Sequence, residues 1–319
     1  MISGSRPSRL IPFLRWGLLA LLLAWAVSQA GHLWGELHAR SLRLEFLPLL
    51  ALAVLGPLLA RGLVTRAIAR HCGHRLDLTS SCAANIMGGL WNLAMPLGAM
   101  GYKAVFLRNR LGIDWREYTG HYGLSFLASL FASALLFLLL QLQSGVNRHP
   151  GAVLALGGAL MILVLLLRPT ATFWGRFTAL EKFAPPFRAP RYLLRFLELT
   201  ALHGCGLAAS VLLYDFGFLA LGLEPSWTVL AGISCAESVL FMVALVPGNL
   251  VLLEGTAGWV GSLQGLSLWS GALVAGLVRL ANLLGLILCA LPAAYLLRRR
   301  GASAPAARTS DQSEDSLSK

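Results

Sequence analysis

Four ionisable side chains stand in segments of the sequence that are otherwise apolar: Lys103, Glu237, Glu254 and Arg279. A charged group at the centre of a bilayer costs about 3 kcal/mol or more unless it is paired or hydrated, so such residues usually have a function. A carboxylate beside a basic group suits a zwitterionic or anionic headgroup. We therefore predict a substrate site built from Lys103, Glu254 and Arg279, with Glu237 as a secondary member.

Asparagines add donors and acceptors to the same segments. Asn92 and Asn249 are included in the predicted site, and Asn85 and Asn282 have the same chemistry. Each amide could bond backbone groups that a helix break exposes, or it could contact a polar substrate. Both roles remain open at the level of sequence.

Each charged candidate also has a structural interpretation. Glu254 and Arg279 could form a buried ion pair, and Lys103 could extend its amino group to the membrane surface. Glu237 could be hydrated at the entrance of a broken helix.

Two other polar groups are interpreted without a function. His71, Cys72 and His74 lie in a basic segment that we expect to be a solvated loop without further ligands, so no metal site is predicted. A proton path through Glu198, His203 and Asp215 is set aside in favour of placement at the membrane interfaces.

The elements that carry these residues must be membrane helices. Hydrophobic residues make up 57% of the 319 residues and charged residues 13%, which is more apolar surface than a soluble core of this size can bury. Apolar stretches close to the 20 residues that cross a bilayer predict about six spans in an all-α bundle. They are 11–30, 44–60, 119–142, 151–167, 193–221 and 270–297. The first stretch is also compatible with a cleaved signal peptide, although its length favours a retained helix.

Two further apolar stretches, 79–106 and 228–266, contain helix-breaking residues. Pro96 and Gly98 interrupt the first stretch, and Pro247 and Gly248 interrupt the second. Such interruptions are typical of broken or re-entrant helices, which are tolerated where their backbone faces protein or a hydrated cavity. We predict two hairpins at these positions.

Clusters of Lys and Arg set the expected orientation, because cytoplasmic loops carry an excess of these residues. The basic runs place both termini in the cytoplasm, with hairpin 79–106 entering from the cytoplasm and hairpin 228–266 from outside. The two hairpins would then form an inverted repeat that shares a site near the bilayer midplane. We expect residues 1–300 to form one domain of a bacterial inner membrane and residues 301–319 a disordered cytoplasmic tail.

Several function classes find no support in the sequence. The net charge of +12 is spread over short clusters between apolar runs, so we expect contact with lipid headgroups and no nucleic acid. No phosphate-binding loop, zinc-protease motif or nucleophile elbow is present. We therefore expect no cofactor, no catalytic residue and no metal, and we expect membrane lipids as partners.

The two hairpins resemble those of the lysylphosphatidylglycerol synthase transmembrane-region family. The similarity rests on Asn92-Leu-Ala-Met-Pro96 with Gly98, Gly101 and Arg108, on Pro247-Gly248-Asn249-Leu-Val-Leu-Leu-Glu254, and on Arg279. Val251 stands where that family usually has glycine, and Lys103 where an arginine is expected. The resemblance implies a flippase-like membrane region without the soluble domain that transfers an amino acid.

Two functions from different classes follow. The first is a translocator that carries a phospholipid or lipid-linked headgroup through the midplane cavity. The alternative is a membrane-embedded transferase or accessory subunit of envelope lipid or lipid-linked glycan biosynthesis, acting with envelope biosynthesis enzymes. A transferase requires a general base, for which Glu254 and Glu237 are the candidates.

Overall fold

The computed structural model describes residues 30–38, 40, 42–95, 97–143, 191–243, 249 and 251–301, together with single positions between 17 and 28. Within these residues all regular structure is helical and no strand occurs. The predicted all-α class is therefore confirmed.

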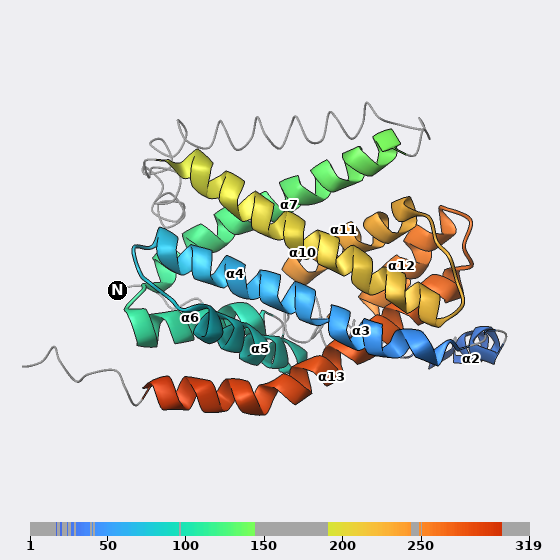
Figure 1. Cartoon of the computed structure of the whole chain (residues 1–319), viewed down its shortest axis with the longest axis horizontal. Helices are drawn as coiled ribbons and strands as arrows, with labels where there is room; N and C mark the ends of the chain where they lie inside the picture. Colours follow the sequence, from blue (N-terminus) through green and yellow to red (C-terminus); the bar gives the residue numbers. More distant parts are fainter. Residues whose placement is uncertain are drawn as a thin grey trace, which may run out of the picture.

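The helices pack into an elongated bundle (Figure 1). In chain order they are α2 (Ala30–His38), η1 (Leu44–Phe46), α3 (Leu47–Ala53), α4 (Leu55–His71), α5 (Leu78–Ala94), α6 (Gly98–Leu111), α7 (Trp115–Gln143), α10 (Tyr192–Ala220), α11 (Trp227–Val243), α12 (Leu252–Ser262) and α13 (Leu268–Gly301).

Four stretches of the described chain are long and apolar enough to cross a membrane. They are Leu44–His71, Trp115–Leu139, Tyr192–Ala220 and Leu268–Arg299. Each contains most of one predicted span, so four of the six predicted spans are confirmed. Predicted span 151–167 lies outside the described residues, as do most of span 11–30 and the tail after Gly301.

Helix α4 continues to His71, well beyond the predicted end of its span at residue 60. Hydropathy falls there because of its arginines, yet Ala67, Ile68 and Ala69 on the other face are buried against neighbouring helices. The helix ends where Gly73 adopts a φ of +81° and the His74 amide donates to the Ala69 carbonyl, a helix-ending arrangement that favours glycine. Packing and this glycine set the boundary, not apolar composition.

The first predicted break is visible between α5 and α6. The side chain of Asp77 caps the start of α5 by accepting from the Ser80 amide at 2.9 Å. The helix stops at Ala94, followed by Met95 in an extended conformation, as expected before a proline. Leu97 then turns back with a φ of 59°. A Cβ on Gly98 would collide with the Trp91 carbonyl, so only glycine allows this close return.

The second predicted break lies between α11 and α12. Helix α11 ends at Val243 and α12 begins at Leu252. Asn249 and Val251, the described positions between them, both have positive φ. Pro96, Pro247 and Gly248 lie outside the described residues.

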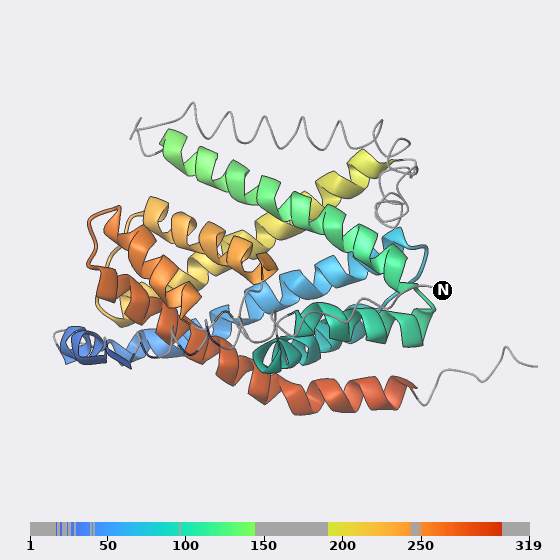
Figure 2. The same ribbon diagram turned by 180° about the vertical axis from the view of Figure 1, so that it is seen from behind.

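The pairs α5–α6 and α11–α12 occupy opposite ends of the long axis, as Figures 1 and 2 both show. The α5–α6 pair packs on α4 and α13, whereas α11–α12 packs on α7, α10 and α13. The C-terminal ends of α4 and α13 and the N-terminal ends of α7 and α10 gather at the α5–α6 end.

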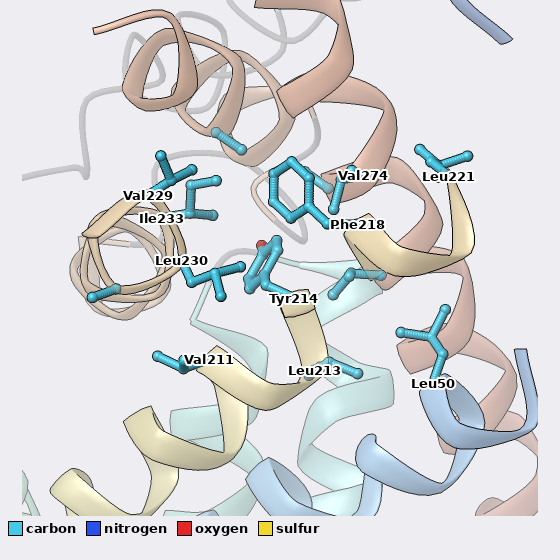
Figure 3. Packing of buried hydrophobic residues seen from close by; sticks show 14 of the residues in the cluster. Leu50, Val211, Leu213, Tyr214, Phe218, Leu221, Val229, Leu230, Ile233 and Val274 are labelled. Carbon is cyan, nitrogen blue, oxygen red and sulfur yellow. The ribbon is translucent and has the colours of Figure 1, made fainter. Parts of the chain in front are cut away.

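Two separate hydrophobic clusters stabilise the two ends of the bundle. The cluster at the α5–α6 end includes Leu107, Tyr118 and Phe196. The other cluster centres on Tyr214 and Phe218 and is shown in Figure 3. Helix α10 contributes to both clusters, and its middle section lies between them.

Candidate functional site

A polar cavity lies at mid-length of the bundle, between the two hydrophobic clusters. Its volume is about 240 Å³, which is large enough to hold several water molecules or a small polar group. Helices α4, α5, α6, α7, α10, α11, α12 and α13 all contribute lining side chains. Both halves of the chain therefore build one cavity.

The lining residues come from the middle of every long apolar helix. They include Leu58 and Arg61, Ser125 and Ser129, Gly206, and Arg279 and Asn282. Gly206 is the central residue of Tyr192–Ala220, which at 1.5 Å per residue puts it roughly 21 Å from either end. The cavity is thus remote from both ends of the spans.

The lining is mainly cationic among its charged groups. Arg61, Lys103 and Arg279 contribute positive charge, His203 adds an imidazole, and Glu237 is the acid among the described lining residues. Within the described part of the chain, Lys103 makes no hydrogen bond or ion pair. A lysine that faces a cavity without a counter-ion attracts an anionic group.

Arg279 joins α13 to the break between α11 and α12. One terminal nitrogen lies 3.0 Å from Oε1 of Glu254, and the other donates to the Asn249 carbonyl at 3.0 Å. The side chains of Arg279 and Glu254 are 15% and 22% exposed. Arg279 therefore pairs with Glu254 and also donates to a backbone carbonyl that the helix break leaves without a helical partner.

Asn249 has a structural role at the same break. Its side-chain amide donates to the Leu240 carbonyl at 2.5 Å, in the last turn of α11, where carbonyls lack helical partners. The residue is 1% exposed. The backbone-bonding interpretation of this asparagine is the one that the geometry supports.

Glu237 is buried within α11 and does not lie exposed at a helix entrance. It is 6% exposed on α11 and lines the cavity. Its carboxyl group lies within hydrogen-bonding reach of the Tyr214 hydroxyl on α10. The second oxygen, Oε2, has no partner among the described residues.

Small hydroxyl groups form a polar seam where α7 meets α10 and α11. Ser125 Oγ lies 2.9 Å from Nε2 of His203, and Ser129 Oγ lies 3.0 Å from Ser238 Oγ. Ser234, one turn before Ser238, also lines the cavity. This seam gives the cavity a hydrogen-bonding wall opposite the asparagines of α5 and α13.

The structure brings most of the predicted site together. Asn92, Lys103, Glu237 and Arg279 all line the cavity. Glu254 reaches it only through Arg279, because its own side chain borders a neighbouring apolar cavity against α2. Asn85 and Asn282 also line the central cavity, and Asn85 donates to the Leu58 carbonyl at 3.3 Å.

Sequence reasoning missed part of the lining. The predicted span 44–60 ends just before Arg61, and the sequence favours a place at the membrane interface for His203. The serines Ser125, Ser129 and Ser133 recur every four residues in an apolar helix. A spacing of four residues puts these serines on one helix face, and this pattern in the sequence indicates a polar face on an otherwise apolar helix.

The segment around Cys72 also differs from the expected solvated loop. His71 is 8% exposed, and Cys72 is half-buried with its sulfur 3.6 Å from Nδ1 of His121 on α7. Glu198 lies beside it and pairs with both Arg70 and His71. The long reach of α4 brings these groups into the bundle.

The described part of the chain is all-helical, and its four long apolar helices enclose a polar cavity at mid-length, which defines a multi-pass membrane protein. The chain belongs to the family described as the lysylphosphatidylglycerol synthase TM region, whose model matches residues 13–290. No curated protein and no solved structure matches the chain significantly. The family match includes every residue of the central cavity.

Proposed function

We propose that this protein is a lipid translocator of a bacterial inner membrane, with the central cavity as the passage for a polar headgroup. The observation that carries the proposal is a cationic, polar cavity at the middle of the four long apolar helices found among the described residues. Helices of this length centred in a bilayer hold such a cavity near the midplane, where a headgroup meets its largest barrier.

The size and surroundings of the cavity suit a headgroup. Its volume of about 240 Å³ is below the 300–1,000 Å³ of pockets that enclose a drug-sized ligand. The acyl chains would therefore stay in the surrounding lipid. Leu93 and Leu97 line the cavity and are 39% and 42% exposed at the bundle surface. They form an apolar rim through which a lipid tail can extend beside the α5–α6 break.

The charge of the lining favours an anionic group, such as a phosphate. Lys103 supplies a point charge to it, and Arg61 a planar fork that matches phosphate oxygens. Arg279 is paired with Glu254, so its charge is largely offset and it adds less to an anion site than Lys103 and Arg61 do.

The topology we propose has two re-entrant hairpins of opposite direction. The pairs α5–α6 and α11–α12 lie at opposite ends of the bundle. Arg66, Arg70, Arg110, Arg195 and Arg299 belong to the helix ends that gather with α5–α6. We therefore place that end, together with both termini, in the cytoplasm.

The test is fluorescent-phospholipid translocation in proteoliposomes with a membrane-impermeant quencher. A sealed vesicle without the protein loses about half of the signal, because only the outer leaflet is accessible. Wild-type protein should raise this fraction well above half, and Lys103→Gln should slow the rate by at least about tenfold, since losing a cavity-facing charge that contacts the headgroup removes roughly 1.4 kcal/mol or more.

The matched control is Arg108→Gln, which removes an exposed charge five residues further along the same helix and should translocate like wild type. Glu254→Gln should also slow transport, because Arg279 loses the carboxylate that positions it. Quenching equal to that of empty vesicles for the wild-type protein would contradict translocation and favour a transferase or accessory role. Equal rates for Lys103→Gln and wild type would contradict the assignment of the site.

A further inference from the structure

A second cluster of functional groups lies outside the central cavity, where the end of α4 meets α7. Cys72, Glu117 and His121 each place one ligand atom within 4.8 Å of the others. Glu117 and His121 are four residues apart and so share one face of α7. Cys72 follows directly after α4, and its neighbour His71 has its ring centroid 6.1 Å from that of His121.

Both histidines carry the hydrogen-bonding pattern of metal ligands. Nδ1 of His121 lies 3.0 Å from the Glu117 carbonyl, and Nε2 of His71 lies 3.1 Å from the Glu198 carboxylate. Because both oxygens only accept, these two ring nitrogens must donate. The other nitrogens, His121 Nε2 and His71 Nδ1, are buried and have no partner among the described residues.

A neutral imidazole held at one nitrogen by a carbonyl or carboxylate presents its other lone pair to a metal in most protein metal sites. An unpartnered lone pair in a buried position otherwise costs about 1–3 kcal/mol. Two unpartnered imidazole nitrogens beside a thiol and a carboxylate therefore destabilise the fold unless a ligand binds them. Thiolate, imidazole and carboxylate together are the donors that Zn²⁺ prefers.

We propose that Cys72, Glu117 and His121 bind a zinc ion, with His71 as the fourth ligand. Tetrahedral zinc with bonds of about 2.0–2.3 Å holds its ligand atoms about 3.3–3.7 Å apart. The ligand atoms of Cys72, Glu117 and His121, now up to 4.8 Å apart, must therefore approach one another by about 1 Å. The Cys72 sulfur faces Nδ1 of His121, so the His121 ring must also turn to present Nε2, and His71, which lies outside this group of three, must move closer. The ion would fasten the end of α4 to α7 and would serve a structural role independent of lipid transport.

The experiment uses the full-length protein in detergent, stripped with a chelator and then titrated with Co²⁺ and Zn²⁺. Cobalt bound to Cys72 should give a thiolate charge-transfer band in the near ultraviolet, and zinc measured by mass spectrometry should approach one per chain. Cys72→Ser and His121→Gln should each weaken binding at least tenfold. The matched controls Cys205→Ser, at an exposed thiol, and His74→Gln, in the same turn, should bind like wild type.

A second measurement avoids any dependence on the folding of the variants. In the wild-type protein, zinc should slow the alkylation of Cys72 by maleimide relative to the zinc-free protein, as read by peptide mass spectrometry. Zinc below about one-fifth of an equivalent, equal binding by Cys72→Ser and wild type, or alkylation of Cys72 that zinc does not slow would each overturn the proposal.

Discussion

At the scale of single residues, Val251 has an unfavourable backbone conformation among the described residues of the second break. Its φ of 66° lies in the region that side chains with a branched Cβ avoid most strongly. The related family usually has glycine at this position, and glycine adopts a positive φ without a steric penalty. Val251 persists because the backbone just before it is fixed at Asn249, whose carbonyl accepts from Arg279 and whose side chain donates to the Leu240 carbonyl.

Replacing Val251 with glycine should therefore stabilise the protein. Relief of the left-handed strain is worth about 1–2 kcal/mol, and the greater freedom of glycine in the unfolded chain costs about 0.5–1 kcal/mol. The net gain of up to about 1 kcal/mol should raise the apparent Tm in detergent. Leu263→Gly, at an exposed position with a φ of −62°, should lower it. A lower Tm for Val251→Gly would show that the valine side chain contributes more by packing than its backbone costs.

At the scale of helices, the crossing of α12 and α13 depends on close backbone contact. A Cβ on Gly258 would collide with the Leu268 carbonyl, and a Cβ on Gly271 would lie 2.6 Å from the Ala257 carbonyl. Small residues at such a crossing allow van der Waals packing that lipid-facing helices otherwise lack. This contact holds Glu254 on α12 next to Arg279 on α13.

A pair of alanine variants in α12 should separate this packing from helix propensity. Gly258→Ala should destabilise by about 1–3 kcal/mol because α13 must shift. Gly255→Ala has open space around the new Cβ, so it should be neutral or stabilising by up to about 1 kcal/mol. Apparent Tm values of the two purified variants give the comparison. A Gly258→Ala variant as stable as Gly255→Ala would mean that the two helices do not approach as described.

At the scale of the whole molecule, a group of polar contacts joins helix α2 to the C-terminal half of the chain. The Ser267 hydroxyl donates to Glu36 at 2.6 Å, and Arg40 contacts both Glu36 and Ser270. His32 stacks on Trp269 with ring centroids 5.4 Å apart. The hydrogen bond from Ser267, followed by the charge of Arg40, lowers the pKa of Glu36.

This contact should weaken in acid. Because the pKa of Glu36 is lower in the folded protein, its contribution to stability is present above the ordinary carboxyl pKa and is lost as pH falls through the folded value. The Tm difference between wild type and Glu36→Gln should therefore shrink from pH 7 to about pH 3.5. The full effect stays below about 1 kcal/mol, because the pair is partly exposed. Glu45→Gln, an exposed acid, is the control; a difference independent of pH would exclude the ionised carboxylate as its cause.

The amino-acid sequence by itself determined that the protein is embedded in a lipid bilayer, where its helices break and which residues form much of its candidate site. Apolar length predicts the four described spans because the bilayer fixes how long a helix must be. Pro96 and Gly98 predict the first break because proline and glycine disturb a helix at their own positions, whatever the rest of the fold. Lys103, Glu237 and Arg279 stand out because charge is expensive in an apolar segment.

Only the tertiary structure decided which polar residues share a cavity and where α4 ends. Arg61 and His203 belong to the lining because packing carries their helices past one another at mid-length, which no local pattern encodes. Glu254 was predicted as a lining residue, but the close crossing of α12 and α13 turns it to the far side of Arg279. Cys72 and His121 meet across 49 residues of sequence, a contact that depends on how whole helices pack and not on spacing along the chain.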